Sequence, residues 1–483
     1  MDWNERMRDF DRCLKEKMEE WKVPGLALAI VKDGNVILSG GYGLRNKAGN
    51  KEVTENTVFA IGSSTKAFTA SAAGILADEG KLEWDAPVKK YMPWFKMYDP
   101  VASDRVTVRD MLCHRTGLPR HEAMWYGSPF SRREIVERIR YLQPSKDFRS
   151  AWQYQNHMLA AVGCLIEEIA GVSWEEFVGE RILKPLEMNG SSFSVEASRQ
   201  ASDHSCPYAA IKDTVVEIPF ANVDTIGPAG SINSTVKDMT GWLLMNLNKG
   251  RFKDRQIISG AAVSQLHSPQ IPGGLNSWRF KELQLSCYGL GWFIECFRGH
   301  KIIHHGGMID GFSALVSFMP EENTGMVILT NLTSRYPFVS AIQYEVYDRL
   351  LGYEGKDWSR EIKEQLAQAA AAAAKKPENH TPPCSRDAEA SYPLKDYSGK
   401  YENPGYGTAT IEENGDRLNI SYNVVKTVLQ YNQPDIFQLN LEVWGISLPV
   451  TFHRNADGDV DRLCVPFGMD PAVKEIEFVR LPV

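Results

Sequence analysis

The two ends of the first 355 residues have the hydrophobic pattern of β-strands. Residues 25–43, GLALAIVKDGNVILSGGYG, hold two apolar runs on either side of Asp33-Gly34. Asp-Gly between apolar runs is a strong local signal for a β-hairpin. After Tyr288 come four more runs with strand character, YGLGWFIECF, HKIIHH, GFSALVSFMP and TGMVILTNLT. A final helix is expected over about 336–351.

Between these ends, the apolar positions are spaced as in helices. Segments such as MLAAVGCLIEEIAG and TVKDMTGWLLMNLNKG carry this spacing and end at glycine. Residues 1–20 have the pattern of another, amphipathic helix. Strand-rich ends around a helical middle predict one sheet built from both ends, with residues of about 63–250 inserted as a helical subdomain. The predicted fold class is therefore α/β (α+β), a layered sheet with helices rather than alternating βαβ units.

The pattern changes again after residue 355. Residues 356–390 combine a helix-prone run, REIKEQLAQAAAAAAKK, with a polar, proline-rich run, which is typical of a linker. Residues 391–483 hold short strand-like runs separated by turn signals such as Asn414-Gly415, and they predict a small antiparallel barrel or sandwich. The predicted domains are thus 1–355, 356–390 and 391–483.

Composition excludes several classes of function. The formal net charge is −7 and no dense Lys/Arg cluster is present, which disfavours a nucleic-acid partner. The N-terminus is charged and has no apolar core of a secretory signal, and no apolar run is long enough to predict a membrane span, so we expect a cytoplasmic protein. The eight cysteines form no C-x-x-C pair, which favours free thiols. H-E-x-x-H is absent, and neither a metal nor a cofactor is predicted.

Candidate chemistry begins at FAIGSSTKAFTA. Lys66 is followed by eleven residues without charge, Ala67 to Ala77, and a helix without a polar face is buried. Burial in the first turn is expected to lower the pKa of this lysine toward neutrality. Positions i and i+3 share a helix face, so Ser63 Oγ can meet Lys66 Nζ, whereas Ser64 points about 100° away.

A helix start of this kind also presents free backbone N–H groups to a developing oxyanion. Serine, amine and oxyanion donor together predict an acyl-transfer nucleophile. The alternative is that Ser63 only caps the helix while Lys66 extends outward. The motif alone does not decide, because Ser234 and Lys237 repeat it beside Asp238, where a surface lysine is expected.

Two downstream motifs change this balance. AWQYQNHM contains Tyr154-Gln155-Asn156, and KIIHHGGMIDGFSA contains His305-Gly306-Gly307. Each motif is weak alone, but their order and spacing after Ser63 are much rarer together.

With these motifs, residues of about 20–352 resemble the penicillin-recognising serine hydrolases, which include class C β-lactamases, D,D-carboxypeptidases, D-aminopeptidases and related esterases. VTVRDMLCHRTGLP, GPAGSINSTVKDM and YGLGW fit the same family. The resemblance implies an antiparallel sheet flanked by helices plus an all-helical subdomain. The C-terminal segment YSGKYENPGYGTATIEENGDRLNISY resembles the lipocalin-like barrel appended to many β-lactamase-related hydrolases.

The resemblance also implies roles for individual residues. Ser63 is expected to be the nucleophile, and Lys66 and Tyr154 are expected to share the general-base and general-acid work. Asn156 is expected to hold Lys66 and bind the substrate carbonyl. The backbone N–H groups of Ser63 and Met308 are expected to form the oxyanion hole.

Two positions depart from the family pattern near the third motif. His305 stands where β-lactamases carry the lysine of K-T-G, and a histidine with a pKa of about 6.5 supplies no fixed charge for a substrate carboxylate. Gly307 is expected to let the substrate backbone lie against its strand. Asp310 replaces a frequent proline, and its charge either suits an amine-bearing substrate or belongs to an exposed turn.

The sequence therefore predicts a metal-independent serine hydrolase that acts through an acyl-enzyme on a small amide or peptide, as a D-aminopeptidase or D,D-peptidase does. The alternatives are a carboxylesterase with weak β-lactamase activity and a non-catalytic penicillin-binding or structural relative. The expected partner is a small-molecule or short-peptide substrate, and the sequence is compatible with a homo-oligomer.

Overall fold

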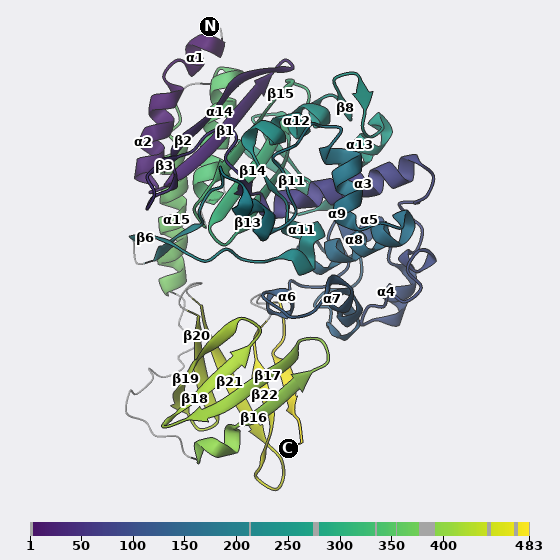
Figure 1. The fold of residues 1–483 in the computed structure, drawn as a ribbon, viewed down its shortest axis with the longest axis vertical. Coiled ribbons are helices and arrows are strands. Elements are labelled where there is room, and N and C mark those ends of the chain that lie inside the picture. The colour runs from purple at the N-terminus through teal and green to yellow at the C-terminus, as the bar shows by residue number, and fades with distance from the viewer. Residues whose placement is uncertain are drawn as a thin grey trace. The chain divides into compact units, whose positions relative to one another are not determined.

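The computed structural model describes most of the chain, namely residues 3–211, 214–273, 280–333, 336–353, 355–375, 392–441, 446–467 and 472–482. The chain divides into two compact units, each built from separate segments (Figure 1). Unit 1 contains Met1–Pro93, Val106–Cys113 and Met158–Ala370, and unit 2 contains Trp94–Arg105, His114–His157 and Ala371–Val483. The predicted domain boundaries near residues 355 and 390 stay a prediction, and residues 376–390 of the predicted linker lie outside the described residues.

A nine-stranded sheet forms the centre of unit 1, in the order β10-β11-β12-β13-β14-β15-β1-β2-β3. Antiparallel pairing of β1 (Gly25–Lys32) with β15 (Thr324–Thr330) joins its two halves, which Figure 1 shows as purple beside green. This pairing confirms that both ends of the first 355 residues share one sheet. The other strands are β2 (Asn35–Asn46), β3 (Lys51–Glu52), β10 (Ile271–Pro272), β11 (Leu283–Tyr288), β12 (Phe293–Phe297), β13 (His300–Ile309) and β14 (Phe312–Met319).

The predicted hairpin at the start of this sheet is also confirmed. Asp33 and Gly34 connect β1 to β2 with φ angles of 51° and 76°. Two consecutive positive φ angles characterise the type I′ turn, which matches the twist of paired strands. Nearly every residue of β1 is buried, so the sheet is covered on both faces.

Helices from both ends of the first 355 residues cover one face of the nine-stranded sheet. The cluster of buried residues that includes Leu28 of β1 also holds Phe10 of α2 (Phe10–Glu20) and Ile342 of α14 (Tyr336–Leu351). The bounds of α14 confirm the expected final helix. The chain continues into α15 (Trp358–Lys375), where a linker was expected from composition.

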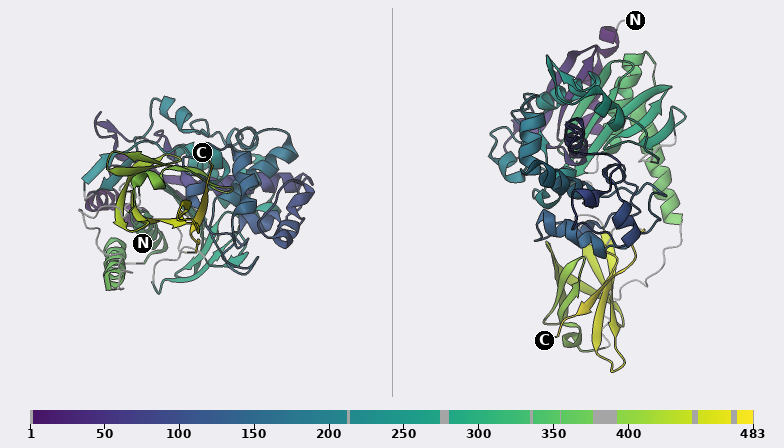
Figure 2. Two further views of the ribbon diagram at one scale, coloured as in Figure 1. Left: turned by 90° about the horizontal axis from the view of Figure 1, so that it is seen from below. Right: turned by 90° about the vertical axis from the view of Figure 1, so that its right-hand side faces the viewer.

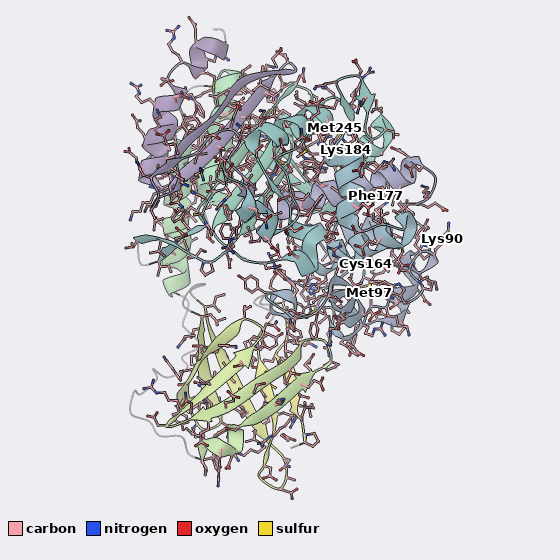
Figure 3. The ribbon with its side chains drawn as sticks, viewed as in Figure 1. Lys90, Met97, Cys164, Phe177, Lys184 and Met245 are labelled. Carbon is pink, nitrogen blue, oxygen red and sulfur yellow. The ribbon has the colours of Figure 1, made fainter. Side chains whose placement is uncertain are left out.

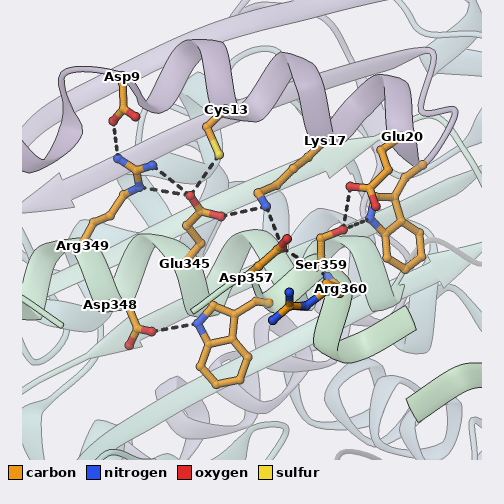
Figure 4. A network of polar contacts seen from close by, with 12 residues as sticks. Asp9, Cys13, Lys17, Glu20, Glu345, Asp348, Arg349, Asp357, Ser359 and Arg360 are labelled. Carbon is orange, nitrogen blue, oxygen red and sulfur yellow. Dashed lines mark hydrogen bonds and ion pairs between the residues drawn. The ribbon is translucent and has the colours of Figure 1, made fainter. Parts of the chain in front are cut away.

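A polar network anchors these three helices to one another (Figure 4). Glu345 of α14 accepts hydrogen bonds from Cys13 Sγ at 3.1 Å and pairs with Lys17 Nζ at 3.2 Å. Trp358, the first residue of α15, is buried and donates from Nε1 to Asp348 Oδ2 at 2.8 Å. The start of α15 is therefore part of the core of unit 1, and the alanines that follow up to residue 370 are exposed.

The helical middle packs against β1, β14 and β15 through α12 (Val236–Leu247). Phe68 of α3 (Thr65–Asp78) stacks on Trp242 of α12, with ring centroids 3.8 Å apart. Figure 3 labels Cys164 and Met245 within this region, both of them buried.

Unit 1 contains further helices and three small two-stranded sheets. The helices are α1 (Trp3–Met7), α5 (Val108–Leu112), α8 (His157–Ala170), α9 (Trp174–Val178), α10 (Val195–Gln200), α11 (Gly227–Gly230) and α13 (Gly260–Leu266). The sheets pair β4 (Phe59–Ala60) with β7 (Asn233–Ser234), β5 (Tyr208–Ile211) with β6 (Thr214–Glu217), and β8 (Arg251–Phe252) with β9 (Arg255–Gln256).

Unit 2 contains a closed barrel of eight strands, β16 to β23, which confirms the predicted C-terminal barrel (Figure 2). Aromatic side chains fill it, among them Tyr397, Phe437 and Phe452. Its strands are β16 (Gly399–Asn403), β17 (Gly407–Asn414), β18 (Arg417–Tyr422), β19 (Val425–Gln433), β20 (Ile436–Leu441), β21 (Ile446–Arg454), β22 (Val460–Val465) and β23 (Ile476–Arg480). The same unit holds α4 (Pro100–Arg105), α6 (Glu122–Trp125) and α7 (Arg132–Arg138).

Two features of the described residues bear on membranes and metals. No single helix among them is long and apolar enough to cross a membrane, although the pair His157–Ala170 and Trp174–Leu183, bent by 79°, passes jointly on length and composition. The same residues contain no group of three or more His, Cys, Asp or Glu side chains arranged to hold a metal ion. The seven cysteines described are free thiols.

Candidate active site

Ser63 and Lys66 form the polar centre of the buried helix start. Ser63 lies in a single 3-10 turn (Gly62–Ser64) that leads directly into α3, and every residue from Thr65 to Leu76 is buried. Lys66 is 0% exposed. Its Nζ donates to Ser63 Oγ at 3.0 Å and to the backbone oxygen of Ala229 at 2.8 Å. Lys66 therefore does not extend into solvent but faces the serine three residues before it.

The neighbouring serine has a different partner. Ser64 is 2% exposed, and its Oγ donates to the backbone oxygen of His305 at 3.0 Å. This bond ties the turn to β13. The two adjacent serines thus point in different directions, as expected from the helical geometry, and Ser63 is the one paired with Lys66.

The backbone of β13 lies directly against the turn that carries Ser63. A Cβ on Gly307 would be 1.7 Å from Ile61 O and 3.1 Å from Ser63 N, so only glycine fits there. Gly62 has a φ of 49°, and a Cβ on it would be 2.9 Å from Met308 N. The close approach brings together the two segments whose backbone N–H groups were predicted to form the oxyanion hole. Gly307 was expected to make room for substrate, and in the structure it makes room for this turn.

His305 is buried behind the same turn. It is 1% exposed, and its Nδ1 lies 2.6 Å from Gly306 O while its Nε2 lies 2.9 Å from the hydroxyl of Tyr288. A carbonyl only accepts, so Nδ1 carries the proton and Nε2 accepts from Tyr288. Burial holds the pKa of His305 well below its usual value of 6.5. The imidazole is therefore neutral and supplies no positive charge.

A small cavity lies at the end of β13. It is lined by residues that include Ala60, Phe220, Ser231 and Ile309, with the two acidic residues Asp224 and Asp310, and its volume of about 10 Å³ has room for about one water molecule. Asp310 is half-buried. It lies in the turn after β13 and lines this small cavity.

Tyr154 and Asn156 lie in unit 2, just before α8. The ring of Tyr154 is half-buried, with its centroid 4.5 Å from that of His114 and 5.3 Å from the guanidinium carbon of Arg120. Asn156 is 6% exposed, and its Nδ2 donates to both carboxylate oxygens of Glu122 at 3.3 Å.

The sequence motifs did not predict Glu122 or Arg120. Glu122 and Asn156 are 34 positions apart, and neither the spacing nor the composition of the segment marks their contact. The only local signal was that the charged pair follows directly after the segment CHRTGLP. The structure thus brings Ser63, Lys66, His305, Gly307 and Met308 together in unit 1, and it places Tyr154 and Asn156 together in unit 2.

The chain is similar to several known proteins. A family model described as Beta-lactamase matches residues 10–348, and a model described as a domain of unknown function, DUF3471, matches residues 385–480. The unguisins hydrolase ungD' of Aspergillus campestris is 28% identical over 93% of this chain and 88% of its own length. Protein flp of Staphylococcus aureus is 26% identical over 69% of this chain and 64% of its own length.

Among solved structures, the fold is similar to that of the octameric penicillin-binding protein homologue from Pyrococcus abyssi. The TM-score is 0.65 at 24% sequence identity, over 99% of this chain and 100% of that one. The structural likeness supports the penicillin-binding-protein-like fold, and relatives named as hydrolases support a hydrolase. Since the family model covers most of the chain, the protein belongs to the beta-lactamase family.

Proposed function

We propose that this protein is a serine hydrolase that cleaves a small amide or peptide bond through an acyl-enzyme on Ser63. The observation that carries the proposal is the buried Lys66 amine 3.0 Å from Ser63 Oγ. Burial disfavours the charged ammonium, and the neutral amine is the form that takes up a proton. In the first step Lys66 Nζ removes the Ser63 proton while Oγ bonds to the carbonyl carbon of the substrate.

The tetrahedral intermediate carries a negative oxygen that needs hydrogen-bond donors. The proposed donors are the backbone N–H groups of Ser63 and Met308, and the glycines at 62 and 307 support this role because they allow the two segments to approach. Fixed donors of this kind are each worth about 10²–10³ in rate.

Collapse of the intermediate breaks the carbonyl–nitrogen bond, and the departing amine needs a proton. We assign this proton transfer to Tyr154, working with Lys66 as a coupled pair. The guanidinium of Arg120 over the Tyr154 ring supports the assignment, since a nearby positive charge stabilises a transient phenolate. Water then attacks the acyl carbonyl, and the reverse proton transfers release the acid and restore Ser63.

The charges around the site favour an amine-bearing substrate over a penicillin. The neutral, buried His305 offers no charge to a substrate carboxylate. The carboxylates of Asp224 and Asp310, which lie near each other at the end of β13, would attract a free amine. The proposed substrates are therefore amides of amino acids with a free amine, including those of D configuration. A homo-oligomer stays a prediction.

The proposal is tested by intact-mass spectrometry of the full chain with D-alanine p-nitroanilide, p-nitrophenyl butyrate and nitrocefin. We expect an acyl adduct and turnover in the wild type and in Ser234→Ala, and neither in Ser63→Ala. The highest kcat/KM is expected on the D-alanine amide. Full activity of Ser63→Ala would disprove the mechanism. A preference for the butyrate ester would identify a carboxylesterase, and an adduct without turnover would identify a penicillin-binding relative.

A further inference from the structure

Buried hydrogen bonds join the C-terminal barrel to the segment that contains α6. The hydroxyl of Tyr406, a residue 1% exposed, lies 2.7 Å from His121 Nδ1. The backbone oxygen of Ala123 accepts from Tyr422 OH at 3.1 Å and from Asn423 Nδ2 at 2.9 Å. Burial holds the pKa of Tyr406 well above its usual value, so its hydroxyl keeps its proton. The barrel is therefore hydrogen-bonded to the side chain of His121 and to the backbone of Ala123.

His121, which contacts the barrel through Tyr406, has an unusual backbone conformation. His121 is 3% exposed and has a φ of 47°, in the left-handed region that residues with a Cβ seldom adopt. Such a residue costs on the order of 1–3 kcal/mol and persists only where its surroundings fix it. His121 is the N-cap residue of α6, and Glu122 is the first residue of that helix. The backbone conformation of His121 therefore determines the orientation of Glu122.

Glu122 in turn contacts one end of the Tyr154-Gln155-Asn156 motif directly and is linked to the other end through Arg120. Its carboxylate accepts from Asn156 Nδ2 at 3.3 Å. It also accepts from Arg120 Nε at 2.9 Å, and the guanidinium of Arg120 lies over the Tyr154 ring, 5.3 Å from its centroid. One carboxylate therefore orients the amide directly and the phenol through Arg120.

The contact also fixes which way the Asn156 amide faces. A carboxylate only accepts hydrogen bonds, so the amide nitrogen must face Glu122 and the amide oxygen must point the opposite way. In that orientation the oxygen is an acceptor for an ammonium or for a substrate N–H. A glutamine at position 122 could face Asn156 with either end of its own amide, and this orientation would then no longer be enforced.

We propose that Glu122 is a positioning residue for Tyr154 and Asn156, and that the barrel holds Glu122 in place through the Tyr406–His121 contact. The inference rests on the proposed function, since it assigns these two residues to acyl transfer. It gives the C-terminal barrel an indirect part in catalysis, because Glu122 and Tyr406 act through other residues.

The first test compares Glu122→Gln with Glu137→Gln, which removes an exposed carboxylate paired with Arg133 at 2.8 Å on α7 of the same unit. Both variants are assayed on D-alanine p-nitroanilide and on p-nitrophenyl acetate. The nitroanilide needs a proton on its leaving group and the nitrophenolate does not, so only the amide depends strongly on Tyr154. A misplaced catalytic group costs up to about 10²-fold, so we expect Glu122→Gln to lose about 100-fold on the amide and about 10-fold or less on the ester.

Thermal unfolding is measured on the same samples, and Glu122→Asp should recover part of the amide activity. A purely structural role would lower both activities in proportion to the folded fraction and leave their ratio unchanged. Equal amide-to-ester ratios in Glu122→Gln, Glu137→Gln and the wild type would overturn the positioning role.

The second test compares two barrel tyrosines, Tyr406→Phe and Tyr401→Phe. Each variant removes one buried hydroxyl, and Tyr401 OH donates within the barrel to Tyr397 O at 2.7 Å. We expect similar losses of thermal stability, but a loss of amide kcat/KM of about 3- to 10-fold only in Tyr406→Phe, since one hydrogen bond is worth about 1 kcal/mol. Equal amide activities of the two variants would disprove the barrel's part in the proposal.

These outcomes separate the inference from the proposed function. If the wild type is no more active than Ser63→Ala on either substrate, the proposed function fails and the inference fails with it. If the wild type is active through Ser63 but the matched variants behave alike, only the positioning role is disproved.

Discussion

The tetrapeptide pattern Ser-x-x-Lys occurs twice in unit 1, and the fold gives the two copies opposite environments. Lys66 is fully buried, with Nζ 3.0 Å from Ser63 Oγ. Lys237 is exposed, and its Nζ reaches Asn56 Oδ1 at 3.4 Å instead of Ser234. Only the first copy joins its serine to its lysine.

The difference comes from where each helix begins. Ser63 lies in a helical turn continuous with α3, so the spacing of three residues places it on the face of Lys66. Ser234 lies in β7, and the helix after it is capped by Thr235, which has extended φ and ψ of −105° and 159°. Ser234 therefore points away, and its Oγ lies 2.8 Å from Ser191 Oγ. The motif brings the serine hydroxyl to the lysine amine only when the serine already lies in a helical turn.

The largest expected effect separates the two lysines directly. Lys66→Met removes the proposed base while keeping an unbranched side chain, and general-base catalysis contributes about 10²–10⁴-fold. We expect kcat/KM on D-alanine p-nitroanilide to fall by about 10³-fold in Lys66→Met and to stay within about 2-fold in Lys237→Met, because an exposed lysine contributes little. The assay is steady-state hydrolysis, with circular dichroism to confirm that both variants are folded. Equal activities would show that burial does not distinguish the two copies.

The sequence was informative wherever the signal was local or periodic. The Asp33-Gly34 hairpin, the helix ending at Leu351 and the barrel strands follow from turn residues and alternation over a few positions. The Ser63–Lys66 pairing follows from helical spacing and from the uncharged residues after Lys66. The first copy could be told from the second because charge in the flanking residues predicts whether a helix face is buried.

Features that depend on long-range approach could not be predicted in this way. Glu122 meets Asn156 across 34 positions, and Tyr288 meets His305 across 17. The reason for glycine at position 307 is also long-range, since the atom that excludes a Cβ belongs to Ile61. A linker composition likewise did not show that Trp358 is buried against Asp348.

A second, smaller effect concerns how folding stability depends on pH near each copy of the Ser-x-x-Lys motif. In the folded state the pKa of His305, behind Lys66, lies well below 6.5 because the ring is buried. Below pH 6.5 the unfolded chain binds a proton that the folded chain does not, so stability is lost as pH falls. One such group contributes about 1.4 kcal/mol per pH unit. Between pH 7 and pH 5, the free energy of unfolding of the wild type should fall by about 1–2 kcal/mol more than that of His305→Gln. Urea unfolding at the two pH values measures this difference.

Asp238, next to Lys237, gives the opposite sign and serves as the contrasting variant. Burial raises the pKa of this carboxyl, so the folded state binds its proton first and gains stability as pH falls through that pKa. Asp238→Asn removes this gain and should steepen the acid-induced loss of stability. The slope of unfolding free energy against pH should change in opposite directions in His305→Gln and Asp238→Asn. A change in the same direction would contradict the opposite pKa shifts of the two groups.

The smallest expected effect concerns the serine that does not face Lys66. Ser64→Ala deletes the hydrogen bond to His305 O, and Ser234→Ala deletes the contact with Ser191 Oγ. A buried hydrogen bond is worth about 1 kcal/mol, so both variants should lose about that much stability in urea unfolding. Ser64→Ala also loosens the turn against β13, where the proposed oxyanion donors meet, so a loss of acylation rate of up to about 5-fold is expected only there. Peptide mapping of the acylated variant should still place the adduct on Ser63. An adduct that disappears in Ser64→Ala would mean that the serine facing Lys66 is not the nucleophile.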